Sequence, residues 1–281
     1  MSINFYGDLH PGDEWVSPDA LVCEGPMSVI ARVYTSDGFV IAADGRMLDG
    51  ATGAIVSDAT QKIFALRYRD GEIACSVAGL AQFTIQNITV KIGAEVVRGS
   101  TAVANVAIKT PDEYAELLAA RICQVLEVFD PEFLSSLSAS LTHIYLDGYF
   151  LGKPMRRTIT LTYKSTGVES VTSADGLTPG KPHVYGSGPL CGFLLCGARD
   201  HSALQLYRDI CAPASSNTVQ AVGAATAIVE AHCDPKALTI DKALCQGIGG
   251  HIHIATVTPD DGFKWTTGPS APTKPLDHHC D

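Results

Sequence analysis

The sequence predicts an α+β fold in which two antiparallel sheets are stacked on each other between two pairs of helices. Strand-like and helical segments come in blocks, in the order strands, two helices, strands, two helices and a closing hairpin. Strands and helices do not alternate one for one, which disfavours a doubly wound parallel sheet. Sheets covered on both faces need many apolar residues, and hydrophobic residues make up 46% of this chain.

The first block of strands begins with residues 28–34 (SVIARVY) and 39–43 (FVIAA), which flank Thr35, Ser36, Asp37 and Gly38. An Asp-Gly pair between two such runs favours a hairpin turn. From Gly79 to about residue 97 the pattern is moderately helical, so we expect a helix there. Between the hairpin and this helix, further strands are predicted at residues 55–56, 62–66 and 72–77.

Capping signals mark the clearest helix. Thr110, Pro111, Asp112 and Glu113 form a capping box with proline at the first helical position. Apolar side chains then recur at helical spacing as far as residue 126. A second block of strands is predicted at residues 141–149, 158–163, 168–172 and 183–185.

The last two helices precede the closing hairpin. Gly186-Ser187-Gly188 leads into a helix predicted at about residues 189–209. Asn217 is a favourable N-cap for another helix, which runs to about His232. The hairpin itself is predicted at residues 251–258 and 262–266.

One domain is expected, because residues 28–267 contain no stretch of linker composition. Residues 1–27 hold three prolines and scattered acidic residues, so they are predicted to be a leader or propeptide-like segment. Residues 268–281 also hold three prolines, lack periodicity and are predicted to be a flexible tail.

Composition and charge exclude several partners. The chain carries 20 Lys+Arg against 30 Asp+Glu, a formal net charge of -10, which argues against binding to nucleic acid. No stretch of about 20 residues is continuously apolar, so no membrane span is expected. The first 26 residues contain no Lys or Arg, which is unlike a signal peptide. We therefore expect a cytoplasmic protein in which the nine cysteines are reduced thiols.

Five stretches together carry a resemblance to a known family. They are SVIARVYTSDGFVIAADGR with SDATQKIFAL, ACSVAGLA, YGSGPLCGFLL and GGHIHIATVTPDDGFKW. In this order, over about residues 27–267, they resemble a proteasome β-type subunit or its bacterial ring-protease (HslV-like) relative. Those proteins are N-terminal nucleophile (Ntn) hydrolases. The resemblance implies a four-layer αββα sandwich, self-association into rings or another homo-oligomer, and a peptide or amide substrate. No cofactor and no metal are expected.

The resemblance also implies a set of site residues. Ser28 lies sixteen residues before Asp44 and matches the nucleophile, whose own α-amino group would be the general base. Asp44 matches the family's aspartate and Lys62 the lysine that it holds. Gly79 matches the glycine whose N–H forms the oxyanion hole, and Ser187 matches the serine that supports the amine.

Each of these residues also has a structural interpretation. Ser28 could be simply the start of a strand, Asp44 could cap a turn, and Lys62 could be a surface lysine. Gly79 could be needed for a positive φ angle, and Ser187 could be only a helix N-cap.

The chain departs from the family pattern at three places. The usual nucleophile is Thr, and a slip of one residue in the alignment would replace Ser28 by Met27, which cannot act. An Ntn nucleophile must also be the first residue of the mature chain, whereas 27 residues precede Ser28. Finally, Cys245 and Ile248 fall where active eukaryotic-type subunits have an Asp and a Ser.

Two functions are consistent with the sequence. If Ser28 is exposed as the N-terminus, the chain is expected to be a serine-type or threonine-type Ntn peptidase or amidase. If residues 1–27 are retained, it is expected to be a catalytically inactive, proteasome-like structural subunit.

Overall fold

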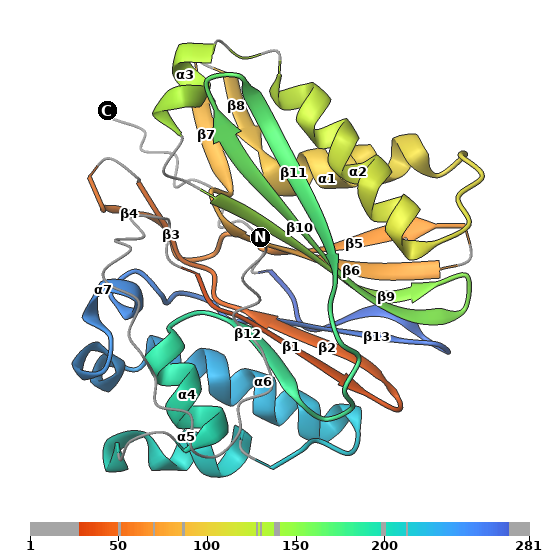
Figure 1. The fold of residues 1–281 in the computed structure, drawn as a ribbon. Helices are drawn as coiled ribbons and strands as arrows, with labels where there is room; N and C mark the ends of the chain where they lie inside the picture. Colours follow the sequence, from red (N-terminus) through yellow and green to blue (C-terminus); the bar gives the residue numbers. More distant parts are fainter. Residues whose placement is uncertain are drawn as a thin grey trace, which may run out of the picture.

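Two five-stranded sheets organise the chain in the computed structural model (Figure 1). The structure describes residues 28–49, 52–69, 71–85, 88–127, 129, 131–137, 141–197, 201–211 and 213–269. The predicted leader and almost all of the predicted tail, residues 270–281, therefore lie outside the described residues.

The sheet that contains β1, the strand that begins two residues after Ser28, is called the first sheet and has the order β12-β1-β2-β13-β14. All of its neighbouring strands are antiparallel. Its strands are β1 (Ile30–Thr35), β2 (Gly38–Ala43), β12 (Pro182–Tyr185), β13 (His253–Thr258) and β14 (Gly262–Thr267).

The second sheet has the order β11-β10-β9-β6-β5 and is also antiparallel throughout. Its strands are β5 (Ile63–Tyr68), β6 (Gly71–Gly79), β9 (Leu141–Phe150), β10 (Lys153–Lys164) and β11 (Gly167–Ala174). Two small hairpins add β3 (Met47–Leu48) with β4 (Ile55–Ser57) and β7 (Gln82–Ile85) with β8 (Ile88–Lys91).

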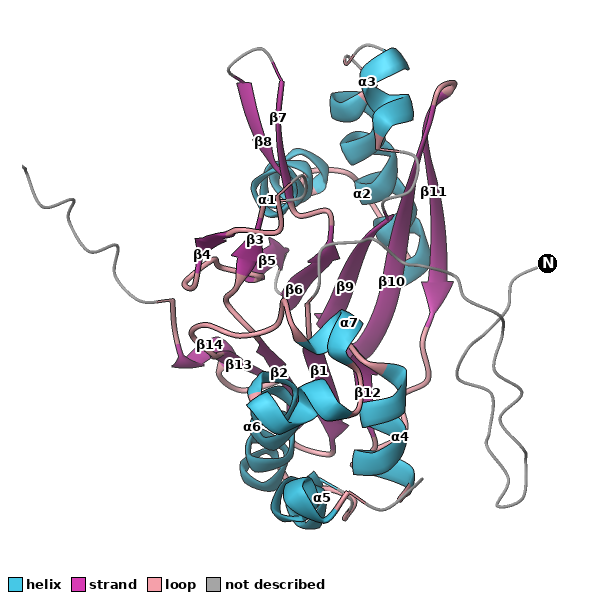
Figure 2. Ribbon diagram, turned by 90° about the vertical axis from the view of Figure 1, so that its left-hand side faces the viewer, coloured by secondary structure: helices cyan, strands magenta, loops and turns pink. Residues whose placement is uncertain are grey.

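Helices lie on the outer sides of the two sheets (Figure 2). One group packs on the second sheet and comprises α1 (Ile92–Val103), α2 (Pro111–Leu126) and α3 (Pro131–Ser136). The other group lies beside the first sheet and comprises α4 (Gly188–Cys196), α5 (Gln205–Cys211), α6 (Thr218–Cys233) and α7 (Lys242–Cys245), with the 3-10 turns η1 (Ser202–Leu204) and η2 (Pro235–Thr239).

The alternation of side chains along β2 explains the layering. Val40 and Ala42 face the helices of the first sheet, whereas Phe39 and Ile41 belong to a cluster that also contains Ala74 of the second sheet. Successive residues of a strand point to opposite faces, so a strand buried on both sides must be apolar at every position. All six residues of β2 are buried. The predicted α+β class with antiparallel sheets is confirmed.

A buried cluster of ion pairs links the two sheets. Asp147 of β9 accepts hydrogen bonds from Arg32 Nε of β1 and from Arg156 Nε of β10, each at 2.6 Å. Arg32 also reaches Asp175, at 3.0 Å. Because Arg32 and Asp147 are both buried, this contact fixes one sheet relative to the other with a charged pair that water does not screen.

Two predicted helices differ from the structure. The segment expected to be helical from Gly79 to residue 97 forms the β7–β8 hairpin, and α1 begins only at Ile92. The helix expected at residues 189–209 is interrupted, because α4 ends where Gly197 adopts a left-handed conformation with φ of 68°. Glycine reaches that conformation at little cost, so it ends a helix readily.

No helix in the described ranges combines the length and the apolar character that crossing a membrane would require.

Candidate functional site

The structure brings Ser28, Asp44 and Lys62 together. Lys62 Nζ donates hydrogen bonds to Ser28 Oγ at 3.0 Å and to Asp44 Oδ1 at 2.7 Å. All three side chains are buried. The ammonium therefore lies between a hydroxyl and a carboxylate, which offsets its charge.

Strand pairing explains why these residues meet. Ile30 of β1 pairs with Ala43 of β2 in an antiparallel arrangement. The residue before Ile30, Val29, is therefore next to the residue after Ala43, Asp44. Val29 N–H donates a hydrogen bond to Asp44 Oδ1 at 3.0 Å. Lys62 comes one residue before β5 and reaches the pair from the second sheet.

The carboxylate of Asp44 is held by further backbone donors. Its Oδ2 accepts from Arg46 N–H at 3.2 Å and from Gly249 N–H at 3.3 Å. A buried carboxylate with several N–H donors and one ammonium is fixed in position. The interpretation of Asp44 as only a turn cap and of Lys62 as a surface lysine does not fit this geometry.

Gly79 ends β6 with a φ of +82°. A Cβ at this position would lie 2.0 Å from the carbonyl oxygen of Leu141, so the backbone requires glycine here. Two residues earlier, Val77 N–H donates to the carbonyl oxygen of Lys62 at 3.0 Å. This links the end of β6 to the residue that carries the ammonium, although no described hydrogen bond joins Gly79 to Ser28.

Ser187 is buried at the start of α4, where its Oγ caps the helix by accepting from Leu190 N–H at 3.3 Å. The pairing of β1 with β12 ends at Ile30 and Tyr185, and Ser28 and Ser187 each lie two residues beyond that last pair. Within the described residues, no hydrogen bond connects the two serines.

Ser187 Oγ also donates to Asp241 Oδ2 at 2.7 Å. Sequence reasoning did not name Asp241. It is the N-cap of α7, where its Oδ1 accepts from Leu244 N–H at 3.1 Å. The sequence did contain a local signal for Asp241, because an aspartate directly before Lys242-Ala243-Leu244 is a favourable helix N-cap. Cys245 is buried, and burial, with Asp241 nearby, raises the pKa of its thiol to about 12.

A buried histidine lies behind the glycine turn that precedes α4. A Cβ at Gly186 would lie 2.8 Å from His232 Nε2 and 3.2 Å from a methyl group of Val29. Burial lowers the pKa of His232 to about 4, so the ring is neutral at pH 7. Its Nδ1 is 2.7 Å from the carbonyl oxygen of Ile228, which fixes the ring.

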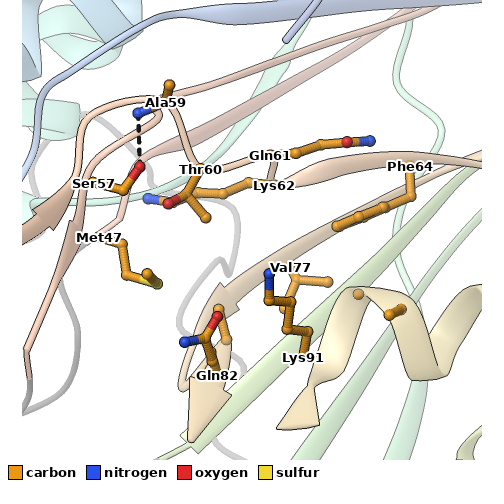
Figure 3. Close-up of a pocket in the computed structure, with 13 residues that line it drawn as sticks. Met47, Ser57, Ala59, Thr60, Gln61, Lys62, Phe64, Val77, Gln82 and Lys91 are labelled. Carbon is orange, nitrogen blue, oxygen red and sulfur yellow. Dashed lines mark hydrogen bonds between the residues drawn. The ribbon is translucent and has the colours of Figure 1, made fainter. Parts of the chain in front are cut away.

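A pocket of about 400 Å³ opens beside Lys62 (Figure 3). It extends from the β3–β4 hairpin to the start of α1, and Met47, Phe64, Val77 and Ala81 give it apolar walls. Lys62, whose Nζ donates to Ser28 Oγ, is the residue that the pocket and the buried cluster share.

No group of three or more His, Cys, Asp or Glu side chains suited to a metal ion occurs within the described ranges.

The two-sheet architecture is similar to the fold of a proteasome-like protein. The chain is similar to the solved structure of Anbu (ancestral β-subunit) from Yersinia bercovieri, with a TM-score of 0.50 and 12% sequence identity, covering 84% of this chain and 86% of that one. It is also similar to an Anbu (Gly-1) mutant from Hyphomicrobium sp. strain MC1, with a TM-score of 0.48 and 14% identity, covering 88% and 89%. At 12% identity, the likeness to the Yersinia protein shows a shared fold.

No protein-family model matches the sequence, and no curated protein matches it.

These comparisons correct the expected resemblance to the proteasome β-type and HslV-like branch. The Yersinia structure is an Anbu protein, and Anbu is a family distinct from HslV, although related to it. The sequence motifs identified the general fold, but they led to the wrong branch.

Proposed function

We propose that this chain is a proteasome-like Ntn hydrolase that cleaves amide or peptide bonds with Ser28 as its nucleophile. The observation that carries the proposal is the position of Lys62 Nζ, 3.0 Å from Ser28 Oγ and 2.7 Å from Asp44 Oδ1. We interpret the two sheets and their outer helices as the four-layer αββα sandwich of Ntn hydrolases. Residues 28–267 would form that domain, residues 1–27 a leader that is removed, and residues 268–281 a tail.

In the proposed mechanism, Ser28 Oγ forms a bond to the substrate's carbonyl carbon. Its proton passes to the α-amino group of Ser28, which becomes free once residues 1–27 are cleaved off. A free α-amino group has a reference pKa of about 8, so it can take up a proton and give it back near neutral pH. The positive charge of Lys62 favours the developing negative charge on Oγ.

The carbonyl oxygen becomes an oxyanion in this step, and we assign the N–H of Gly79 to hold it. When the carbon–nitrogen bond breaks, the leaving amine takes the proton from the α-ammonium group. Water then attacks the ester formed on Ser28, and the acid product is released. We assign Ser187 and Asp241 a supporting role, because their hydrogen bond fixes a hydroxyl two residues beyond the last pair of β12 with β1.

We also propose that the chain self-associates into a ring or another homo-oligomer. Support comes from apolar side chains that lie exposed on the helices outside the first sheet, such as Leu206 and Val219. Exposed apolar side chains on one face favour contacts between subunits. Light scattering coupled to size-exclusion chromatography measures the mass of the particle, and a monomer at all concentrations contradicts this proposal.

The mature N-terminus tests the catalytic proposal. Intact-mass spectrometry is expected to find a chain that begins at Ser28. Amide hydrolysis is expected in the native protein and is expected to be lost in Ser28→Ala. Ser36→Ala is the matched control, because Ser36 is an exposed serine in the β1–β2 turn and should leave the rate unchanged.

The alternative is a structural subunit without activity. The 27 residues before Ser28 favour it, because a retained leader leaves no α-amino group to accept the proton. A mass that still includes residue 1, together with equal rates for the native protein and Ser28→Ala, would support this alternative and exclude the amine-base mechanism.

A further inference from the structure

The pocket beside Lys62 carries a positive charge that no carboxylate balances. Lys62 and Lys91 both line it, and none of the described lining residues is Asp or Glu. The charge of Lys62 is offset by Asp44, whose Oδ1 lies 2.7 Å from Lys62 Nζ. Among the described residues, no ion pair includes Lys91.

Lys91 and Gln82 form the polar side of this pocket. They are paired directly across the β7–β8 hairpin, so their side chains lie next to each other on the same face. In Figure 3 the amino group of Lys91 and the amide of Gln82 both point toward the space near Val77 and Met47.

The ammonium of Lys91 is unpaired within the described part of the chain. None of the ion pairs or side-chain hydrogen bonds of the described residues includes it. Lys91 is the N-cap residue of α1, but an ammonium has only donors and cannot accept a hydrogen bond from the backbone N–H groups there. An exposed cation that lines a partly apolar pocket and has no partner among the described residues is available to an incoming anion.

We infer that this pocket selects a substrate with a carboxylate-bearing side chain, such as glutamate, at the residue whose carbonyl Ser28 attacks. Met47, Val77 and Ala81 would contact the methylene groups of that side chain. Lys91 would meet its carboxylate, and the amide N–H of Gln82 would donate a second hydrogen bond. This inference rests on the proposed function, because it assigns the preference to the same site.

The preference is expected to be modest and sensitive to salt. Lys91 is exposed, and a pair formed with an exposed cation is partly screened by water and ions. A discrimination of about fivefold between a charged and a neutral side chain of equal size corresponds to such a pair.

The test compares peptides that differ only in glutamate, glutamine or lysine before the scissile bond. The native protein is expected to cleave the glutamate peptide with a kcat/KM about fivefold above that of the glutamine peptide. Lys91→Met keeps the length of the side chain and is expected to bring the ratio to about one. Lys91→Glu is expected to favour the lysine peptide. Lys109→Met, at an exposed lysine outside the pocket, is the matched control and should preserve the native ratio.

A binding measurement on the same peptides, made as carboxy-terminal amides, separates this inference from the proposed function. Isothermal titration calorimetry on the full chain measures the affinity for each peptide whether or not the protein hydrolyses it. Cleavage without a glutamate preference overturns the inference and leaves the hydrolase proposal standing. Tighter binding of the glutamate amide that is lost in Lys91→Met and in high salt, without cleavage, supports the pocket's selectivity and overturns the hydrolase. If the experiments detect neither cleavage nor selective binding, both the inference and the hydrolase proposal are overturned.

Discussion

Ser187 and Asp241 are 54 residues apart in the chain, and a hydrogen bond of 2.7 Å joins Ser187 Oγ to Asp241 Oδ2. This contact connects the N-termini of α4 and α7. The hydroxyl of Ser187 is thus held by a carboxylate whose position depends on tertiary structure.

Replacing Asp241 is expected to separate the capping role from the role of its charge. Asp241→Ala removes the acceptor for Leu244 N–H and for Ser187 Oγ, so the free energy of unfolding should fall by about 1–2 kcal/mol. Asp241→Asn keeps a capping oxygen and should cost less. Urea titration measures both changes.

The control for this comparison is Asn217→Ala, which removes the N-cap of α6 without touching Ser187. It should destabilise the protein as Asp241→Ala does, yet leave amide hydrolysis unchanged. If Asp241→Asn and Asn217→Ala have the same effect on hydrolysis, Asp241 has only a capping role.

Sequence patterns predicted correctly those helices and hairpins whose capping or turn residues are adjacent in the sequence. The capping box at Thr110 predicted the start of α2, and its Oγ does accept from Glu113 N–H at 3.1 Å. The Asp-Gly turn predicted the β1–β2 hairpin. The β7–β8 hairpin was missed although its two strands, QFTI and ITVK, alternate polar and apolar residues, because each run is only four residues long and the sequence continues directly into α1. Gly197 was passed over because a single glycine also occurs inside helices.

The candidate site was predictable only in part. The spacing of Ser28, Asp44 and Lys62 came from a resemblance, and strand pairing explains why that spacing brings them together. Asp241 could not be placed in this way, because its partner lies on another helix and nothing local links them. The choice between family branches also failed, since motifs shared by related folds do not separate them.

Gly79 is expected to tolerate no side chain. Gly79→Ala would place a Cβ 2.0 Å from the carbonyl oxygen of Leu141, in a backbone conformation that alanine rarely adopts. Gly53→Ala is the matched control, because Gly53 has a φ of +68° but no atom within 4 Å of the added Cβ. Gly53→Ala should lose about 1 kcal/mol of unfolding free energy and Gly79→Ala at least about 3 kcal/mol. Similar losses by urea titration would contradict the predicted clash.

Asp147 should be among the residues most important for stability. Asp147→Asn leaves the guanidinium groups of Arg32 and Arg156 buried without their shared counter-charge, so a loss of about 3–5 kcal/mol is expected. Asp112→Asn is the control, because Asp112 pairs with Arg157 at the exposed surface and should cost less than about 1 kcal/mol.

The same carboxylate should make the protein sensitive to acid. Burial alone would raise the pKa of Asp147, but Arg32 and Arg156 outweigh it, and the net pKa lies below the ordinary value. The unfolded chain therefore takes up this proton first as the pH falls. Its contribution to stability is present above about pH 4 and is lost as the pH falls further. Chemical unfolding followed from pH 7 to pH 3 tests this, and an Asp147→Asn variant with the wild-type pH profile would contradict it.

His232 is expected to add a second pH dependence, at higher pH. Burial lowers the pKa of this ring to about 4 in the folded protein, whereas an unfolded histidine has a pKa of about 6.5. Between those values the unfolded chain binds the proton and the folded chain does not. Stability is therefore fully present above about pH 6.5 and falls as the pH decreases toward 4, by about 2 kcal/mol at pH 5.

The expected measurement compares the native protein with His232→Leu by urea titration at pH 7.5 and pH 5. The neighbours of the ring cannot take over its role, because burial raises the pKa of the Cys191 thiol, 3.9 Å away, to about 12. His183 and His253 also have pKa values lowered to about 4 by burial, so the variant should keep part of the pH dependence. The difference in unfolding free energy between the two pH values should shrink by about 2 kcal/mol in His232→Leu. An unchanged difference would mean that His232 is not held neutral by its burial behind Gly186.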